Sequence, residues 1–222
     1  MFSQLFPNVN LEDMITATNE TIYMTVISVA GTFILGLLLG LLLYLSGPGG
    51  LWQNKTLNWI TAAIVNVFRA IPFIILILLL FPFTDFLVGT IRGPNAALPA
   101  LIIGGAPFYA RLVEIALKEV DKGVVEAAKS MGAKYSSIVF KVLLPESMPA
   151  LISGITVTAI ALVGYTAVAG VIGAGGLGDF GYYYGFQRSD FDVVLFCTIL
   201  IVLIVFVFQF VGDFISRKLD KR

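Results

Sequence analysis

The sequence lacks histidine altogether and contains one cysteine, and charged residues make up only 13% of its 222 residues. Histidine is the commonest metal ligand and general base, so the usual side chain for acid–base or metal chemistry is missing. The single cysteine, Cys197, excludes an internal disulfide bond and argues against a structural zinc site. No G-x4-G-K-[ST] sequence is present, which excludes a phosphate-binding loop of that kind. We therefore predict that the chain performs no bond chemistry and holds neither a metal nor a cofactor of its own.

Apolar residues dominate instead, at 58% of the chain with a mean hydropathy of +0.95. Soluble domains are usually about a quarter charged, so this composition indicates an all-α integral membrane protein in the lipid bilayer. The 14 basic and 14 acidic residues balance, and no positive field favours nucleic acid as a partner. We predict one transmembrane domain over residues 1–222 with five spans, at about residues 21–45, 71–88, 96–117, 147–172 and 191–216.

The second span needs a separate argument, because residues 57–90 form a run too long for one upright helix. At ~1.5 Å per residue this run exceeds the ~30 Å hydrocarbon core. We predict that Leu57–Phe68 is a tilted or interfacial lead-in. Pro72 then kinks or restarts the helix before the span proper.

The distribution of basic residues predicts the orientation. In this scheme ten lysines and arginines fall on one side of the membrane and two on the other, and the basic side is normally cytoplasmic. The N-terminus is therefore expected outside and the C-terminus in the cytoplasm. The outer pair is Arg92 and Arg188, and the inner set is Lys55, Lys118, Lys122, Lys129, Lys134, Lys141, Arg217, Lys218, Lys221 and Arg222.

The longest polar interruption is the segment 121–145, which we predict to be two short helices on the cytoplasmic face. Gly132 should end the first helix, because glycine readily adopts a positive φ. Ser136 or Ser137 is expected to cap the second helix, and Pro145 to end its regular hydrogen bonding. Four residues at helical spacing give the first helix an apolar face for a partner, namely Val124, Val125, Ala128 and Met131.

Several residues within the spans are expected to have structural roles. Gly36 and Gly40 allow a close helix approach, either within the bundle or at a dimer face. Arg69 should snorkel to the cytoplasmic headgroups or serve a structural purpose, because a charge in lipid is costly. Arg111 and Glu114 are three residues apart, and we favour an ion pair between them over direct substrate contact. The full structural set is Arg69, Pro72, Pro107, Arg111 and Glu114.

The fourth span is small and weakly polar, which suits either a helix lining a pathway or tight helix packing. We favour the pathway, because this helix follows directly from the polar segment. Gly173–Gly178 then matches G-x-G-x-x-G, but no strand precedes it and a tyrosine-rich loop follows, so we reject a dinucleotide site. These glycines are expected to shape an outer turn or a re-entrant segment. The proposed pathway and gate residues are Tyr165, Thr166, Ala167, Val168 and Ala169.

The pattern from Glu126-Ala127-Ala128 through Gly132 and Val142 to Leu144-Pro145 resembles the EAA loop of binding-protein-dependent ABC importer permeases. The one departure is Val142, where the family has isoleucine. The resemblance implies a type I ABC importer permease fold. In that fold this loop of the permease forms a coupling helix that docks onto the ATP-binding subunit. The residues that it assigns to coupling are Glu126, Ala127, Ala128, Met131, Gly132, Leu144 and Pro145.

Further segments resemble the methionine importer permeases, namely residues 66–75, 105–114, 141–146, 164–170 and 173–178. This resemblance implies a homodimer in the bacterial cytoplasmic membrane with two ATP-binding subunits, which would bind ATP and Mg, and a lipid-anchored extracytoplasmic substrate-binding protein. In such a dimer, two copies of Val168 are expected to face each other and narrow the inner gate.

The predicted function is therefore that of a permease subunit forming the pathway for methionine, of both stereoisomers. The alternatives are a permease for another small amino acid or polar metabolite, and a self-sufficient secondary transporter. The secondary transporter would use Arg69, Arg111 and Glu114 as an ion relay. It would also need inverted repeats, and five spans do not divide evenly.

Overall fold

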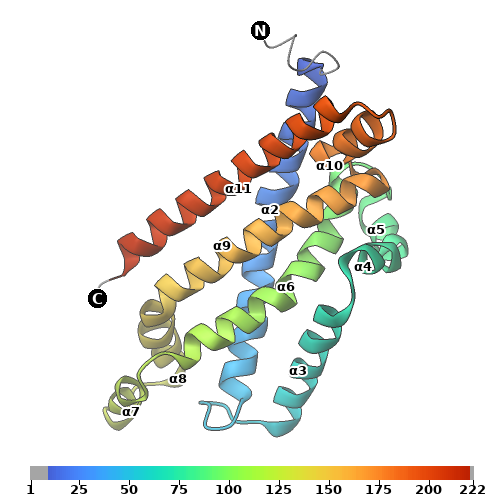
Figure 1. Cartoon of the computed structure of the whole chain (residues 1–222). Helices are drawn as coiled ribbons and strands as arrows, with labels where there is room; N and C mark the ends of the chain where they lie inside the picture. The colour runs from blue at the N-terminus through green and yellow to red at the C-terminus, as the bar shows by residue number, and fades with distance from the viewer. Residues whose placement is uncertain (1–9, 221–222) are drawn as a thin grey trace.

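The computed structural model describes residues 10–220, which form helices and turns without a strand among them (Figure 1). Lys221 and Arg222, which contributed to the predicted orientation, lie outside the described residues. The α-helices are α2 (Leu11–Ser46), α3 (Lys55–Ala70), α4 (Phe73–Leu79), α5 (Phe81–Val88), α6 (Pro94–Lys118), α7 (Lys122–Ser130), α8 (Tyr135–Ile138), α9 (Leu144–Ala169), α10 (Gly176–Phe180) and α11 (Phe191–Leu219). Three short π-helical segments join them, namely η1 (Val139–Leu143), η2 (Gly170–Ala174) and η3 (Gly181–Phe186).

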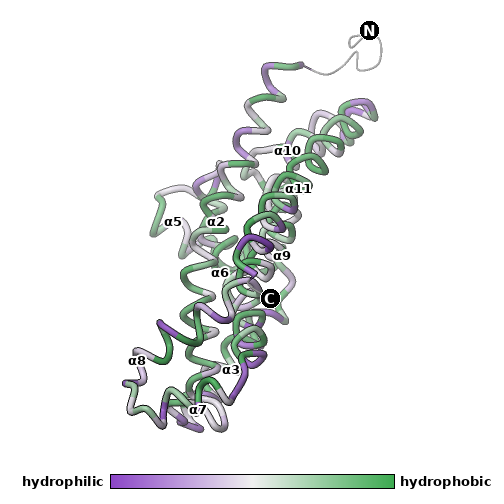
Figure 2. The backbone as a smooth tube through the Cα atoms, turned by 90° about the vertical axis from the view of Figure 1, so that its left-hand side faces the viewer, coloured by the Kyte–Doolittle hydropathy of each residue, from purple (hydrophilic) through white to green (hydrophobic). Residues whose placement is uncertain are grey.

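Four helical stretches in the described part of the chain are long and apolar enough to cross a membrane, and a bent pair could supply a fifth crossing. The four are α2, α6, the stretch Tyr135–Ala174 and α11. Helix α2 begins at Leu11, ten residues before the expected span, because Asn10 caps it by accepting a hydrogen bond from the Glu12 backbone N–H at 3.1 Å. Glu12 and Asp13 in its first turn also suit the positive end of the helix dipole. Figure 2 shows hydrophobic residues along the long helices and hydrophilic residues near their ends.

The prediction of a continuous second span over residues 71–88 is wrong. The structure has two short helices there, α4 and α5, and the chain bends by 107° between α3 and α4. Pro72 causes this break, since it disfavours a helical conformation for Ile71, which is extended at φ −78° and ψ 122°. The expected lead-in is the larger part of α3, so any second crossing consists of α3 followed by α4.

The bundle is centred on the contact between α2 and α6. This contact requires two glycines on α2, where any side chain would clash with α6. A Cβ atom at Gly36 would lie 2.8 Å from the Ala106 carbonyl oxygen, and one at Gly40 would lie 2.5 Å from the Val113 Cβ. The two glycines therefore serve packing within the chain, which decides between the two alternatives considered above. Tyr109 on α6 is fully buried and donates a hydrogen bond from its hydroxyl to the Leu151 carbonyl of α9 at 3.2 Å.

This packing predicts a contrast between two Gly→Ala variants. Gly40→Ala should lower the thermal unfolding midpoint, with a cost of about 1–3 kcal/mol, because α6 must move to admit a methyl group. Gly164→Ala is the control, since nothing lies within 4 Å of a Cβ there, and alanine favours a helix interior over glycine by about 1 kcal/mol. Thermal unfolding of both purified variants in detergent measures the difference. A Gly40→Ala protein as stable as the wild type would contradict the close approach.

Candidate functional site

The polar segment forms a compact projection at one end of the bundle, which we call the knob and define as residues 121–143 (Figure 1). Asp121 begins α7, accepting a hydrogen bond from the Gly123 backbone N–H at 2.7 Å. At the other end Gly132 has φ +74°, as predicted, and its N–H donates to the Lys129 carbonyl at 2.9 Å. Ala133 N–H donates to the Ala128 carbonyl at 3.1 Å, which completes a Schellman motif. The chain reverses at Gly132 because this motif requires a left-handed residue.

Two predictions about the second half of the knob are wrong. The residue before α8 is Lys134, without a side-chain cap, so neither Ser136 nor Ser137 begins the helix. Pro145 does not end the helix either, because it lies in the first turn of α9, directly after the π-helical segment η1. Proline lacks an N–H and crowds the carbonyl four residues earlier, and the wider turn before it accommodates both effects. Helical structure therefore continues from Tyr135 through η1 to Ala169, and it is broken further along by non-helical dihedrals at Ile172 and Gly173.

The predicted apolar face of α7 is divided between the core and the surface. Ala128 is 6% exposed and Val125 packs beside it, so these two side chains hold α7 against the bundle. Met131 is 81% exposed, and Val124 and Phe140 are exposed with it. An exposed cluster of large apolar side chains at a membrane protein's aqueous end is typical of a protein-binding surface. Of the residues predicted for coupling, the exposed ones are Glu126, Ala127, Met131, Gly132 and Pro145, while Leu144 is half-buried against the core.

A cavity of about 690 Å³ separates α7 from the bundle. Its walls come from the loop after α2, the end of α6 and one face of α7. Charged side chains of both signs line it, namely Glu114, Lys118, Lys122, Glu126 and Lys129. The knob is thus attached to the bundle along one side and is separated from it by polar space on the other.

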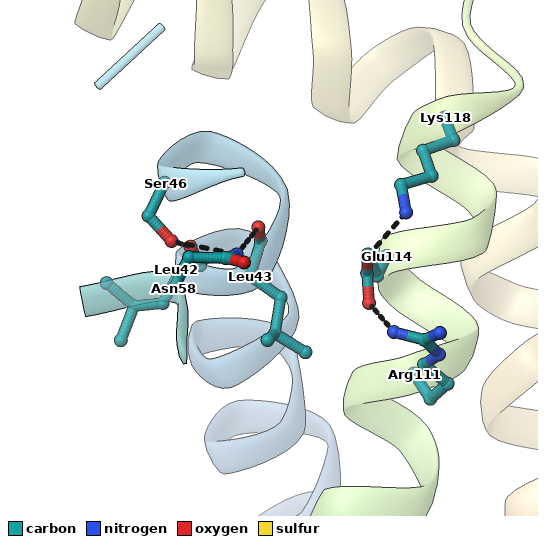
Figure 3. A network of polar contacts seen from close by, with 7 residues as sticks. All are labelled: Leu42, Leu43, Ser46, Asn58, Arg111, Glu114 and Lys118. Carbon is teal, nitrogen blue, oxygen red and sulfur yellow. Dashed lines mark hydrogen bonds and ion pairs between the residues drawn. The ribbon is translucent and has the colours of Figure 1, made fainter. Parts of the chain in front are cut away.

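An ion-pair cluster lies at the end of α6 beside this cavity (Figure 3). The predicted pair is confirmed, with Arg111 Nη1 at 2.5 Å from Glu114 Oε2. Lys118 Nζ contacts the other Glu114 oxygen at 2.6 Å, a contact that the i,i+4 spacing could have indicated. The Glu114 side chain is 8% exposed and both cations remain near water. Each pair therefore adds little net stability, of the order of 0–1 kcal/mol, and the cluster serves mainly to neutralise a buried carboxylate.

The predicted gate residues lie at the opposite end of α9 from the knob (Figure 1). Tyr165 stacks on Phe73 of α4, with ring centroids 4.4 Å apart and planes 2° apart. Thr166 is buried and donates from its hydroxyl to the Val163 carbonyl at 2.7 Å. Val168 is half-buried against the core cluster that includes Phe73. With the knob on the predicted cytoplasmic side, Val168 does not lie at an inner gate, because it is 24 residues from Leu144, or ~36 Å along the helix, at the end of α9 opposite the knob.

The Gly173–Gly178 segment forms a tight reversal between α9 and α10, with positive φ at Gly173, Gly175 and Gly176. A Cβ at Gly178 would collide with the Ala167 backbone, so the two helices meet directly. The segment is a turn at the end of α9 opposite the knob, and no strand precedes it in the described chain. Its location outside the membrane stays a prediction.

Glu20 and Thr21 hold this turn, a contact that the sequence analysis missed. The Gly176 N–H donates to the Glu20 carboxylate at 2.7 Å, and the Leu177 N–H donates to the Thr21 hydroxyl at 2.8 Å. Burial, and then the charge of Glu20, raise the pKa of Asp179 on α10. The partners are 156 residues apart, so no local pattern could have paired them.

The remaining structural candidates lie in or beside α6. Pro107 is buried inside the helix, which continues through it, so the Gly104–Pro107 sequence does not interrupt α6. Arg69 is at the end of α3, directly before the Pro72 break. It lines a small cavity with Gly104 and Tyr165, so the α3–α4 break, the middle of α6 and the outer part of α9 meet there.

Comparisons with known proteins agree with this arrangement. Residues 33–222 match the family described as binding-protein-dependent transport system inner membrane component. The chain is 64% identical over 222 residues to the methionine import system permease protein MetP of Bacillus subtilis, covering 100% of both chains. It is 43% identical over 213 residues to the probable D-methionine transport system permease protein MetI of Vibrio cholerae, covering 96% of this chain and 95% of the relative.

Solved structures are similar as well. A chain of the MetNI methionine ABC transporter, solved in inward facing conformations, superposes with a TM-score of 0.93 at 44% identity, covering 95% of this chain and 98% of that one. A chain of an amino acid ABC transporter crystallised with histidines superposes with a TM-score of 0.73 at 19% identity, covering 95% and 99%. The second likeness shows the fold alone.

Proposed function

Because the chain belongs to the binding-protein-dependent transport system inner membrane component family, we propose that it forms the route for methionine through an ATP-driven importer. It is an all-helical, multi-pass permease subunit of an ABC transporter, and a separate subunit hydrolyses ATP. The observation that carries the methionine assignment is the 64% identity, over the full length of both chains, to the methionine import permease of Bacillus subtilis. A self-sufficient secondary transporter is excluded, because the chain belongs to the family of inner membrane components of binding-protein-dependent transport systems.

Both stereoisomers of methionine are the proposed substrates. The relatives are named for methionine import in one case and for D-methionine transport in others, which supports a route without a strict stereochemical filter. Methionine is a zwitterion with a flexible apolar side chain. A route lined by small groups and a hydroxyl, as at Tyr165 and Ala167, suits such a substrate, whereas the buried Thr166 hydroxyl is bonded to the Val163 carbonyl.

The knob is the proposed contact with the ATP-binding subunit, which would bind ATP and Mg. Exposed Met131 and Phe140 supply the apolar surface, and Glu126 and Ala127 are exposed beside them. The continuous helical stretch from Tyr135 to Ala169 supports a mechanical role. A displacement of the knob would then be carried along α9 to the gate residues, as in rigid-body alternating access.

The complete transporter is proposed to contain two copies of this chain, two ATP-binding subunits and a lipid-anchored substrate-binding protein. In this arrangement the N-terminus and the Gly173–Gly178 turn face the outside, and the knob faces the cytoplasm of a bacterial cell. The clustering of basic residues at the knob end supports this orientation in the described part of the chain. The two copies of Val168 would narrow the outer end of the route.

Uptake of radiolabelled methionine into proteoliposomes tests the function and the gate together. The wild-type transporter should take up both stereoisomers. Val168→Trp should abolish uptake while complex recovery and basal ATP hydrolysis remain, because the indole would fill the narrow end. Val207→Trp on α11 is the matched control, since Val207 is exposed on the surface of the chain, and it should transport normally. Loss of the complex in Val168→Trp would indicate packing instead of a gate, and transport of a different amino acid in place of methionine would overturn the substrate.

Gly132 tests the coupling role of the knob. Gly132→Val should separate ATP hydrolysis from uptake, because a β-branched residue at φ +74° costs about 1–2 kcal/mol and disturbs the Schellman motif. Gly132→Asn is the control, since asparagine tolerates the left-handed region, and it should retain most coupling. The ratio of methionine transported to ATP hydrolysed measures the effect. Wild-type coupling in Gly132→Val would contradict the assignment.

Cysteine labelling tests the orientation, in a Cys197→Ala background. A membrane-impermeant thiol reagent should label Arg188→Cys in intact cells, and should label Lys129→Cys only after lysis. Both positions are exposed in the chain, so accessibility depends on the side of the membrane. Labelling of Lys129→Cys from outside would reverse the proposed topology.

A further inference from the structure

The break between α3 and α4 leaves a cavity of about 130 Å³ in the bundle. Three segments that are distant in sequence form its walls, namely the end of α3 with the start of α4, the middle of α6 and the outer part of α9. The volume corresponds to about four water molecules at ~30 Å³ each. The residues that matter for its chemistry are Phe68, Arg69, Phe73, Gly104, Phe108 and Tyr165.

Arg69 is the charged residue of this cavity, and it is unpaired. Among residues 10–220 it has neither an ion-pair nor a hydrogen-bond partner. Arg111, in contrast, is neutralised by Glu114. An unpaired charge within a transmembrane bundle is costly and usually marks a substrate or ion pathway.

Arg69 lies far along α3 from the end near the knob. Lys55 begins α3, and Arg69 is 14 residues further along the helix. This separation is ~21 Å along the helix at 1.5 Å per residue. The Arg69 side chain is exposed in the single chain and lines the cavity at the α3–α4 break.

The other walls of the cavity are aromatic. Phe73 and Tyr165 are stacked at 4.4 Å, and Phe68 and Phe108 add two further rings. Aromatic rings make favourable contacts with thioether sulfur as well as with apolar carbon. The lining contains no acidic side chain, so its one fixed charge attracts an anionic group. Gly104 keeps the space open, because a Cβ there would lie 3.2 Å from Leu76 and 3.3 Å from Phe73.

We propose that this cavity is a transient substrate subsite in which Arg69 binds the carboxylate of the amino acid in transit, with the thioether chain against the surrounding rings. This inference rests on the proposed function and names a residue that contacts the substrate. The cavity is too small to enclose a whole amino acid, so it binds the carboxylate end and leaves the rest in the open route. The absence of an acidic partner for the substrate's ammonium group keeps binding weak, which allows release. Tyr165 is three residues before Val168, so movement at the gate changes one wall of the subsite.

Photo-crosslinking in the complete transporter tests the subsite. A diazirine analogue of methionine is supplied to proteoliposomes that contain the permease, the ATP-binding subunit and the binding protein, and labelled peptides are mapped. Label is expected in this chain on the segments around Phe68, Phe108 and Tyr165, and excess unlabelled methionine should suppress it. Arg69→Gln should reduce this label by about tenfold or more, the usual effect of losing a hydrogen bond to a charged group. Arg92→Gln removes an exposed arginine of an outer loop and should change it by less than about twofold.

Two further variants separate substrate binding from a structural role of Arg69. Arg69→Lys keeps the charge and should recover part of the label, whereas a purely structural guanidinium would show no such dependence on charge. Gly104→Val fills the cavity from α6 without altering the arginine, and should also reduce the label in an assembled transporter. If Arg69→Gln fails to assemble, the Gly104→Val variant alone tests whether the cavity binds substrate. Label that maps outside the cavity, or that persists in assembled Arg69→Gln or Gly104→Val, overturns the subsite. The proposed function still stands in that case if the wild-type transporter takes up methionine. Failure of the wild type to transport methionine removes both.

Discussion

The helical continuity from Tyr135 to Ala169 is the constraint on which the rest of this structure depends. A permease has to connect an event in the cytoplasm with a change at the far side of the membrane, and a flexible joint between the two would absorb the motion. Pro145 is placed where it would ordinarily create such a joint. The π-helical segment before it accommodates the missing N–H and the ring, so helical structure continues past Pro145. The second half of the knob and the proposed gate residues consequently belong to one helical stretch.

The packing around this element shows how one part of the bundle is held firmly while other parts retain freedom. Helix α6 is held tightly on one side by the close approach of α2 at Gly36 and Gly40, and joined to α9 by the Tyr109 hydroxyl. The knob packs against the core through Ala128, Ile138, Val139 and Leu143 on one side, and has a polar cavity behind α7 on the other. A tight α2–α6 pair provides the fixed frame against which α9 and the knob can move.

Sequence reasoning succeeded where the relevant physics is local. The left-handed turn at Gly132 and the ion pair between Arg111 and Glu114 depend on residues within a few positions, and both are confirmed. It failed at Pro145 and over residues 71–88, because a proline can be accommodated or can break a helix according to its surroundings. It also missed the contact of Glu20 with Gly176, since only the folded chain brings them together. The inner-gate position expected for Val168 conflicts with the predicted cytoplasmic knob, because α9 runs away from the knob for the 24 residues between Leu144 and Val168.

The charged residues of the bundle also divide into those that support the fold and those proposed to contact the substrate. A buried carboxylate that serves only structure should be neutralised, and Glu114 has two cations on its two oxygens. A cation that serves a passing substrate has to remain unpaired until the substrate arrives, and a permanent carboxylate partner would compete with the ligand. Arg69 meets this condition, and the aromatic residues beside it in the cavity supply no competing charge. An unpaired guanidinium beside a cavity of the bundle is difficult to explain in a residue that only supports the fold. It is expected where the free energy of pairing is reserved for a ligand that must bind weakly and then leave.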